Sequence, residues 1–253
     1  MNLESFEGLI YFFLCLLLFI LGQRWLHREL QSVLLLITRN PQLSIGLFSV
    51  LFFPGVLLHE MSHLMVAWLL RVPIRRISLF PQLLPDGKLR MGYVETAASD
   101  VIREGLIGAA PLFSGSALVA FIGINRLGLI PLVAHAFDSN WLKIIEGMSA
   151  VTRVEDFWLW FYLAFVVSST MLPSSSDRRA WLPIGMAAIF LVGLALFAGA
   201  GPWLFANLTL PLNDLLQSLS LILIASLILH GCLALPTFFI RIFISKVTRM
   251  QVM

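Results

Sequence analysis

The sequence predicts an all-α, polytopic membrane protein of about six transmembrane helices, with a short β-hairpin after the second. Hydrophobic residues make up 59% of the 253 residues and charged residues only 12%, and the mean hydropathy of +0.91 exceeds that of a soluble domain. The apolar residues gather in six segments, and about 20 residues suffice for a helix to cross a bilayer. No shift in composition divides the chain, so we expect one membrane-embedded domain across residues 1–253.

The six apolar segments predict the membrane helices in order. The first is short for a span, and residues 23–40, in which basic residues flank a short apolar run, suit a helix that lies at the membrane interface. Residues 138–155 carry apolar side chains at helical spacing and predict an amphipathic surface helix. The apolar segments are residues 8–22, 43–70, 105–124, 157–172, 181–201 and 215–240.

The basic residues indicate how the chain is oriented. If the N-terminus lies inside, the inner loops hold eleven Lys and Arg residues and the outer loops hold six. The positive-inside rule therefore predicts that both termini lie in the cytoplasm. The pI of about 9.2 reflects these loops, and no nucleic-acid-binding motif accompanies it. A compact chain without a targeting segment suits a prokaryotic plasma membrane.

Residues 74–96 have a different pattern from the rest of the chain. Leu89, Met91 and Tyr93 alternate with polar or small residues, and residues 85–87 read Pro-Asp-Gly, which favours a turn. We therefore expect a β-hairpin directly after the second apolar segment. Such a hairpin either covers the protein at the membrane interface or presents a strand edge that holds a substrate in extended form.

Residues 59–63 read His-Glu-Met-Ser-His and lie within the second apolar segment. On a helix, two histidines four residues apart lie about 40° from each other and can bind one metal ion from successive turns. Glu60 lies about 100° round from His59, close enough to hold a water at the metal without binding the metal itself. Because ionisable groups in lipid are costly, they normally face a partner, a cavity or an ion. The motif predicts His59 and His63 as metal ligands and Glu60 as the catalytic base.

Two further features lie near this motif. Residues 54–55, Pro-Gly, come one turn before His59, and they either bend the helix and open its backbone or represent a proline that a membrane helix tolerates. Residues 108–111 read Gly-Ala-Ala-Pro, and together with Gly115 they predict a helix that packs closely against its neighbours.

A catalytic zinc site needs a third protein ligand and an open position for water. Carboxylates and imidazoles at the inner ends of other spans can supply it, which favours Asp177, in the serine-rich loop after the span that Pro173 ends. Alternatively, Asp177 forms an interfacial ion pair with the neighbouring Arg178 and Arg179. His230 has no partner at ligand spacing, so we expect a packed or hydrogen-bonded histidine there.

With these residues, the chain resembles the site-2 protease family of intramembrane zinc metalloproteases. In that family, a membrane-embedded His-Glu-x-x-His helix is paired with an aspartate two spans later, in a motif like Asn-x-x-Pro followed by Asp-Gly. Residues 170–173, Thr-Met-Leu-Pro, with Asp177 occupy that place, and residues 108–111 are similar to a small-residue and proline element of the intervening span. The resemblance covers roughly residues 43–180 and implies Asp177 as the third ligand.

The chain departs from the family pattern at three positions. Thr170 stands where the family often has an asparagine that steadies the substrate carbonyl, so the resemblance implies Thr170 as the oxyanion donor, with one hydroxyl of shorter reach. Asp177 lies one residue closer to Pro173 than is usual. Arg178 follows it in place of glycine.

The resemblance implies a zinc metalloendopeptidase of regulated intramembrane proteolysis. Zn²⁺ would acidify a water and polarise the scissile carbonyl, and Glu60 would transfer the proton to the leaving amine. The substrates would be single-pass or membrane-tethered proteins cut within or near the lipid bilayer. Two other functions fit the same first motif: a membrane zinc hydrolase that acts on prenylated proteins or lipids, and a catalytically degenerate scaffold or chaperone that binds client helices.

Overall fold

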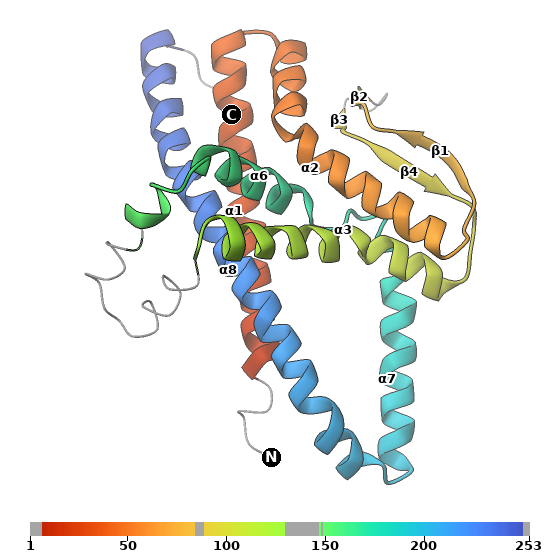
Figure 1. The fold of residues 1–253 in the computed structure, drawn as a ribbon. Coiled ribbons are helices and arrows are strands. Elements are labelled where there is room, and N and C mark those ends of the chain that lie inside the picture. Colours follow the sequence, from red (N-terminus) through yellow and green to blue (C-terminus); the bar gives the residue numbers. More distant parts are fainter. Residues whose placement is uncertain (1–6, 84–88, 130–146, 148, 250–253) are drawn as a thin grey trace.

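The computed structural model describes residues 7–83, 89–129, 147 and 149–249, and these are mostly helical (Figure 1). Two apolar helices, α6 and α7, are shorter than a typical span, and the predicted helix at 138–155 lies largely outside the described residues. Four helices are long and apolar enough to cross a membrane, which confirms a mostly helical chain of multi-pass membrane character. These are α1 (Glu7–Thr38), α2 (Pro41–Leu69), α3 (Val101–Phe121) with its π-helical extension η2 (Ile122–Arg126), and α8 (Gly201–Thr248); the shorter two are α6 (Phe157–Thr170) and α7 (Trp181–Phe197).

α1 is one continuous helix, so the prediction of a separate interfacial helix at residues 23–40 is wrong. Leu26 and Leu36 are fully or almost fully buried in this second half of α1. Glu29 is buried as well, and its carboxylate pairs with the Arg241 guanidinium of α8. The basic residues that suggested an interface therefore belong to a helix packed along most of its length against α8.

α1 and α8 run parallel to each other along their length (Figure 1). Near their starts, the Gly8 amide donates to Asn213 Oδ1 at 2.7 Å, and near their ends Glu29 pairs with Arg241. An even number of spans with both termini on one side would set the first and last spans antiparallel. The parallel pair is therefore at odds with the expectation that both termini lie in the cytoplasm. That expectation rests on counts of Lys and Arg in the loops, and these counts do not report which helices cross the membrane.

α2 continues unbroken through Pro54 but changes direction midway along its length (Figure 1). It begins at Pro41, and the Oδ1 of the preceding Asn40 caps the amides of the first turn. A proline lacks the amide hydrogen of a helical residue and its ring crowds the preceding turn, which bends a helix. The Tyr162 hydroxyl of α6 donates to the Leu51 carbonyl at 2.8 Å, one turn before Pro54. Of the two alternatives for residues 54–55, the structure shows a bent helix without a break.

The predicted β-hairpin follows α2 directly and is confirmed. Its outer strands β1 (Ile74–Ser78) and β4 (Tyr93–Thr96) pair antiparallel, as do the short strands β2 (Gln82–Leu83) and β3 (Leu89–Arg90) beyond them. The Pro-Asp-Gly turn at residues 85–87 lies outside the described residues. The Phe80 ring stacks on Phe53 of α2 with centroids 6.4 Å apart, so the hairpin lies over α2.

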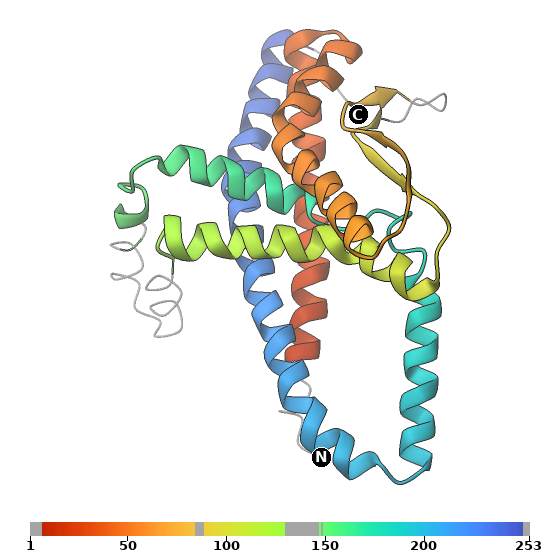
Figure 2. The same ribbon diagram turned by 45° about the vertical axis from the view of Figure 1, so that its right-hand side comes forward.

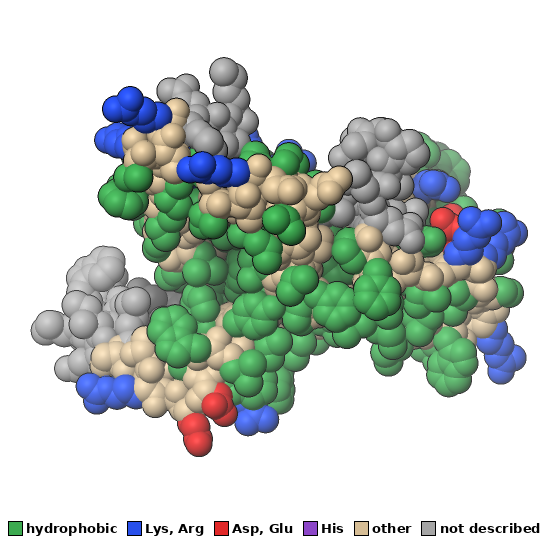
Figure 3. All heavy atoms as spheres, turned by 90° about the horizontal axis from the view of Figure 1, so that it is seen from above, with side chains coloured by type: hydrophobic (Ala, Val, Ile, Leu, Met, Phe, Trp, Pro, Cys, Tyr) green, Lys and Arg blue, Asp and Glu red, His purple; other side chains and the backbone are tan. Residues whose placement is uncertain are grey.

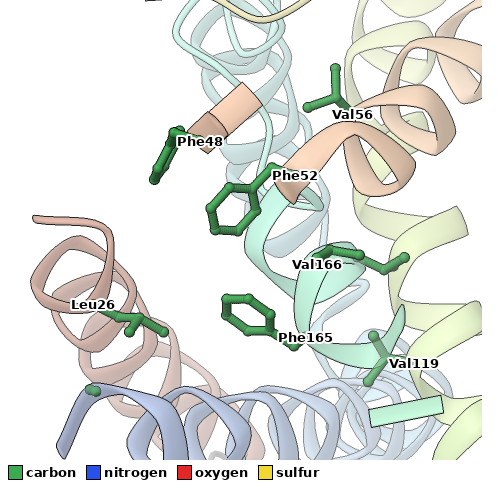
Figure 4. Packing of buried hydrophobic residues seen from close by; sticks show 9 residues of the cluster. Leu26, Phe48, Phe52, Val56, Val119, Phe165 and Val166 are labelled. Atoms are coloured by element: carbon green, nitrogen blue, oxygen red, sulfur yellow. The ribbon is translucent and has the colours of Figure 1, made fainter. Parts of the chain in front are cut away.

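α3 and α6 lie across the α1–α8 pair and beside each other (Figures 1 and 2). Where the helices meet, the rings of Phe52 and Phe165 lie with centroids 5.5 Å apart at the centre of the largest core cluster (Figure 4). This cluster joins five helices around the C-terminal half of α6. Its buried members are Leu26, Phe48, Phe52, Val56, Val119, Phe165, Val166, Val167 and Ala234.

α7 is apolar on all sides, and none of its residues is buried. Its ribbon lies apart from the other helices between its two ends (Figure 2). It contacts α3 near its start, where Ile184 packs against Gly105. A helix of this composition that is exposed all round is suited to lipid and not to water. Seen from above, hydrophobic side chains are exposed over much of the molecule, and Lys and Arg gather at its margins (Figure 3).

Candidate metal centre

The structure brings His59, His63 and Asp177 together. The two Nε2 atoms of the histidines, which lie one turn apart on α2, are 3.2 Å from each other. Asp177 comes from the loop between α6 and α7, and its carboxylate oxygens lie 3.6 Å from His59 Nε2 and 3.5 Å from His63 Nε2. These three side chains form a group that could hold a metal ion, and it is the group that the sequence predicted.

Backbone carbonyls hold both imidazole rings in the orientation that a metal ligand needs. His59 Nδ1 lies 2.6 Å from the Thr170 carbonyl of α6, and His63 Nδ1 lies 2.8 Å from the Ile107 carbonyl of α3. Because a carbonyl can only accept, each Nδ1 carries the hydrogen, and each Nε2 presents its lone pair to the shared centre. Neither carbonyl could be identified from the sequence, since both contacts join residues far apart in the chain.

Pro173 explains how the end of α6 becomes part of the centre. In a continuing helix, the amide of residue 174 would donate to the Thr170 carbonyl, but α6 stops at Thr170. The Ser174 amide instead donates to Asp177 Oδ2 at 2.7 Å, and the Thr170 carbonyl is left for His59. One helix end thus supplies both the support of a histidine and the support of the carboxylate.

Glycines allow the three helical segments to approach closely. A Cβ at Gly108 of α3 would stand 1.9 Å from the Asp177 carbonyl oxygen, and one at Gly115 would stand 2.4 Å from Met171 Cβ. On α2, a Cβ at Gly55 would stand 2.3 Å from the Val166 carbonyl of α6. The close helix approach predicted for Gly108 and Gly115 is therefore observed, and its partner is the loop that carries Asp177.

The Asp177 carboxylate faces the histidines and is ionised at neutral pH. Without a metal ion, burial by itself raises the pKa of Asp177, but hydrogen bonds from the His59 and His63 rings when their Nε2 atoms are protonated, the charge of His63 in that form and the bond from the Ser174 amide outweigh burial and lower the pKa well below its usual range. An ionised carboxylate is the form that binds a cation. The neighbouring Arg178 directs its Nε to the Ser174 carbonyl at 3.3 Å, so the alternative of an Asp177 pair with Arg178 is not what the structure shows.

Glu60 is buried beside this group and next to the hairpin. A Cβ at Gly92 would stand 3.0 Å from Glu60 Cγ and 3.3 Å from its Oε1, so the backbone before β4 lies directly against this carboxylate. Glu60, the histidines and Asp177 all line one cavity of about 360 Å³. Its wall comes from α2, the β3–β4 segment, the end of α6 and the serine loop: Val56, His59, Glu60, His63, Met91, Gly92, Tyr93, Val94, Ser169, Thr170, Leu172, Ser174, Ser176 and Asp177.

Thr170 lies at the cavity, but its hydroxyl is occupied within its own helix. Its Oγ1 lies 3.0 Å from the Val166 carbonyl and 3.2 Å from the Val167 carbonyl, which leaves no hydrogen directed at the cavity. An oxyanion role would need rotation about χ1, and it stays a prediction. The structure shows a different contribution from Thr170: its backbone carbonyl accepts the hydrogen bond from His59 Nδ1. The residue type alone could not indicate this contact.

No protein-family model, no curated protein and no solved structure matches this chain. What the centre can do chemically follows from its own geometry. Two imidazole nitrogens, one carboxylate and a second, buried carboxylate around a cavity can bind a divalent cation and transfer a proton beside it.

Proposed function

We propose that the chain is an intramembrane zinc metalloprotease of the site-2 protease type. The observation that carries this proposal is the convergence of His59, His63 and Asp177, with Glu60 beside them, among helices of membrane-spanning character. The apolar helices α1, α2, α3, α6, α7 and α8 would lie in the membrane around the centre, but they would not all cross it, because α1 and α8 run parallel.

Zinc fits the donor set and its spacing. Two imidazoles and a carboxylate with an open fourth position are typical of catalytic zinc. For tetrahedral zinc, bond lengths of about 2.0 to 2.2 Å place neighbouring ligand atoms about 3.3 to 3.6 Å apart. The three separations here, 3.2, 3.5 and 3.6 Å, lie close to that range. The Nδ1 bonds to backbone carbonyls provide the outer support that such ligands need.

In the proposed reaction, zinc and Glu60 have separate roles. Zinc, when bound, lowers the pKa of a water and polarises a carbonyl. The Glu60 carboxylate accepts a proton from the attacking water while the water oxygen bonds to the scissile carbon. Glu60 then gives that proton to the amide nitrogen as the C–N bond breaks.

A substrate would be presented as an extended segment beside β4. A peptide bond within a membrane helix is already hydrogen-bonded, so the substrate must unwind before it can be cut. β4 pairs with β1 on one side, and residues 92–94 line the cavity next to Glu60. Backbone pairing along this segment would replace the hydrogen bonds that the substrate loses.

The test is cleavage of membrane-helix substrates by the purified full chain in proteoliposomes. A panel of fluorogenic single-pass substrates is incubated with wild type, with Glu60→Gln and with Ser62→Ala, a neighbour on α2 whose hydroxyl donates to the His59 carbonyl. We expect Glu60→Gln to retain zinc and to lose at least about a hundredfold in rate, whereas Ser62→Ala stays within a few-fold of wild type. Cleavage by Glu60→Gln at the wild-type rate would contradict the mechanism.

The rival functions give different results in the same assay. A hydrolase of prenylated proteins or lipids would leave the helix panel intact and release product from those substrates in a Glu60-dependent manner. A scaffold or chaperone would bind the panel without cutting it and would be indifferent to Glu60→Gln.

A further inference from the structure

A buried polar cluster joins α1, α6 and α8 beside the metal centre, and none of its members belongs to the ligand motif or to the Asp177 loop. Its members are Gln23 of α1, Ser169 of α6 and His230 of α8. Gln23 Nε2 donates to the Ser169 carbonyl, and the Ser169 hydroxyl lies 2.9 Å from His230 Nε2. Ser169 and His230 are almost fully buried, with 3% and 1% of their surfaces exposed. Polar groups so deep in an apolar protein are costly, so their arrangement calls for a role.

The contacts of His230 fix its ring and its hydrogen. Its Nδ1 lies 2.6 Å from the Ser226 carbonyl, which can only accept, so Nδ1 carries the hydrogen. In the neutral ring Nε2 is then an acceptor, and the Ser169 hydroxyl donates to it. The rings of Phe19 and Phe165 pack edge to face against the imidazole at 5.2 and 5.4 Å. Ser169 is therefore bound to a side chain that cannot turn freely.

The Gln23 side chain replaces a backbone hydrogen-bond donor that Pro173 lacks. In a continuing helix, the amide of residue 173 would donate to the Ser169 carbonyl, but proline has no amide hydrogen. The Gln23 side chain donates to that carbonyl in its place. The last turn of α6 is thus held through a backbone carbonyl by α1 and through a side-chain hydroxyl by α8.

We propose that Gln23 and His230 are positioning residues of the metal centre. Both fix Ser169, and the next residue is Thr170, whose carbonyl holds His59 Nδ1 at 2.6 Å. Displacement of Ser169 moves that carbonyl, tilts the His59 ring and spoils the geometry of the three ligands. This inference rests on the proposed metal site and assigns to α1 and α8 a part in metal binding that lies outside the ligand motif.

The experiment measures metal binding by the full chain in detergent micelles. Zinc affinity is determined by competition with a chromogenic chelator, and the visible absorption spectrum of the Co²⁺ form reports the coordination geometry. The variants Gln23→Leu and His230→Phe each remove one bond to Ser169. His230→Gln keeps an acceptor for the Ser169 hydroxyl, and Thr237→Val on α8 is the matched control, because the Thr237 hydroxyl donates to Leu233 of its own helix.

We expect Gln23→Leu and His230→Phe to weaken zinc binding about tenfold and to alter the Co²⁺ spectrum, as changes in the outer support of a ligand do. His230→Gln should recover most of the loss, and Thr237→Val should match wild type. If His230→Phe does not fold, the zinc affinity and Co²⁺ spectrum of Gln23→Leu alone test the inference. Wild-type affinity and an unaltered spectrum in the variants that fold would overturn the inference.

The outcome for wild type separates this inference from the proposed protease. If wild type binds zinc but cleaves no substrate, proteolysis is wrong, whereas weaker binding in Gln23→Leu still supports the positioning role. If wild type cleaves and the variants bind zinc normally, only the positioning role is wrong. If wild type binds no metal, both are wrong.

Discussion

The carbonyl oxygen of Asp177 occupies the space beside Gly108 that any side chain at that position would need. A Cβ at residue 108 would stand 1.9 Å from this oxygen, which is far inside van der Waals contact. The partner atom belongs to the backbone, so it cannot swing away as a flexible side chain could. Gly108 therefore determines how closely the Asp177 loop approaches the two histidines.

We expect Gly108→Ala to weaken zinc binding and to lower stability by about 1 to 3 kcal/mol, because overpacking forces the backbone apart. Zinc affinity and thermal unfolding in detergent measure the two effects. Gly185→Ala in α7 is the matched control, since among the described residues, apart from its chain neighbours and its own helix backbone, no atom lies within 4 Å of its Cβ position. Normal zinc affinity in Gly108→Ala would show that the loop does not depend on this contact.

Pro173 is expected to be needed for the centre because it ends α6, although it is neither a predicted metal ligand nor the predicted base. Pro173→Ala supplies an amide hydrogen to the Ser169 carbonyl and favours another turn of α6, which draws the Ser174 amide away from Asp177. We predict a loss in zinc affinity of about tenfold or more. Pro183→Ala, near the exposed start of α7, controls for the general effect of removing a proline, and equal affinities for the two variants would refute the argument.

Gly92 is expected to affect catalysis and not metal binding. A Cβ at this position would stand 3.0 Å from Glu60 Cγ and 3.2 Å from Val56 Cγ1, so Gly92→Ala displaces the Glu60 side chain. Because small misplacement of a catalytic group is costly, we predict about a tenfold lower kcat with zinc content unchanged. Gly46→Ala on α2, whose Cβ position has open space, is the control. A loss of zinc in Gly92→Ala would instead mean that the hairpin supports the ligands.

Local patterns in the sequence predicted the features that depend on neighbouring residues. Apolar runs indicated the helices, alternation indicated the hairpin, and the four-residue spacing indicated the His59–His63 pair, because each signal reflects one element and its solvent. Asp177 could be selected because Pro173 marks the end of a span and few carboxylates remain in such an apolar chain.

The features that sequence reasoning missed depend on contacts between distant segments. The parallel course of α1 and α8 and the continuity of α1 follow from packing, including the Glu29–Arg241 pair, which joins residues more than 200 positions apart. The sequence places Gln23 in a stretch expected at the interface, and it predicts a packed or hydrogen-bonded histidine at His230, which the structure shows. Nothing in their neighbours indicates that both meet at Ser169.

The most direct test of the metal centre is the zinc content per chain of the purified protein, compared among wild type, His59→Ala and Asp177→Ala. We predict one zinc per chain in wild type, its loss in His59→Ala, and weakened binding in Asp177→Ala, because two histidines alone leave the cation without its anionic ligand. Unchanged zinc in Asp177→Ala would contradict the three-ligand centre. A folded wild-type protein that holds no zinc would contradict the protease and favour the scaffold.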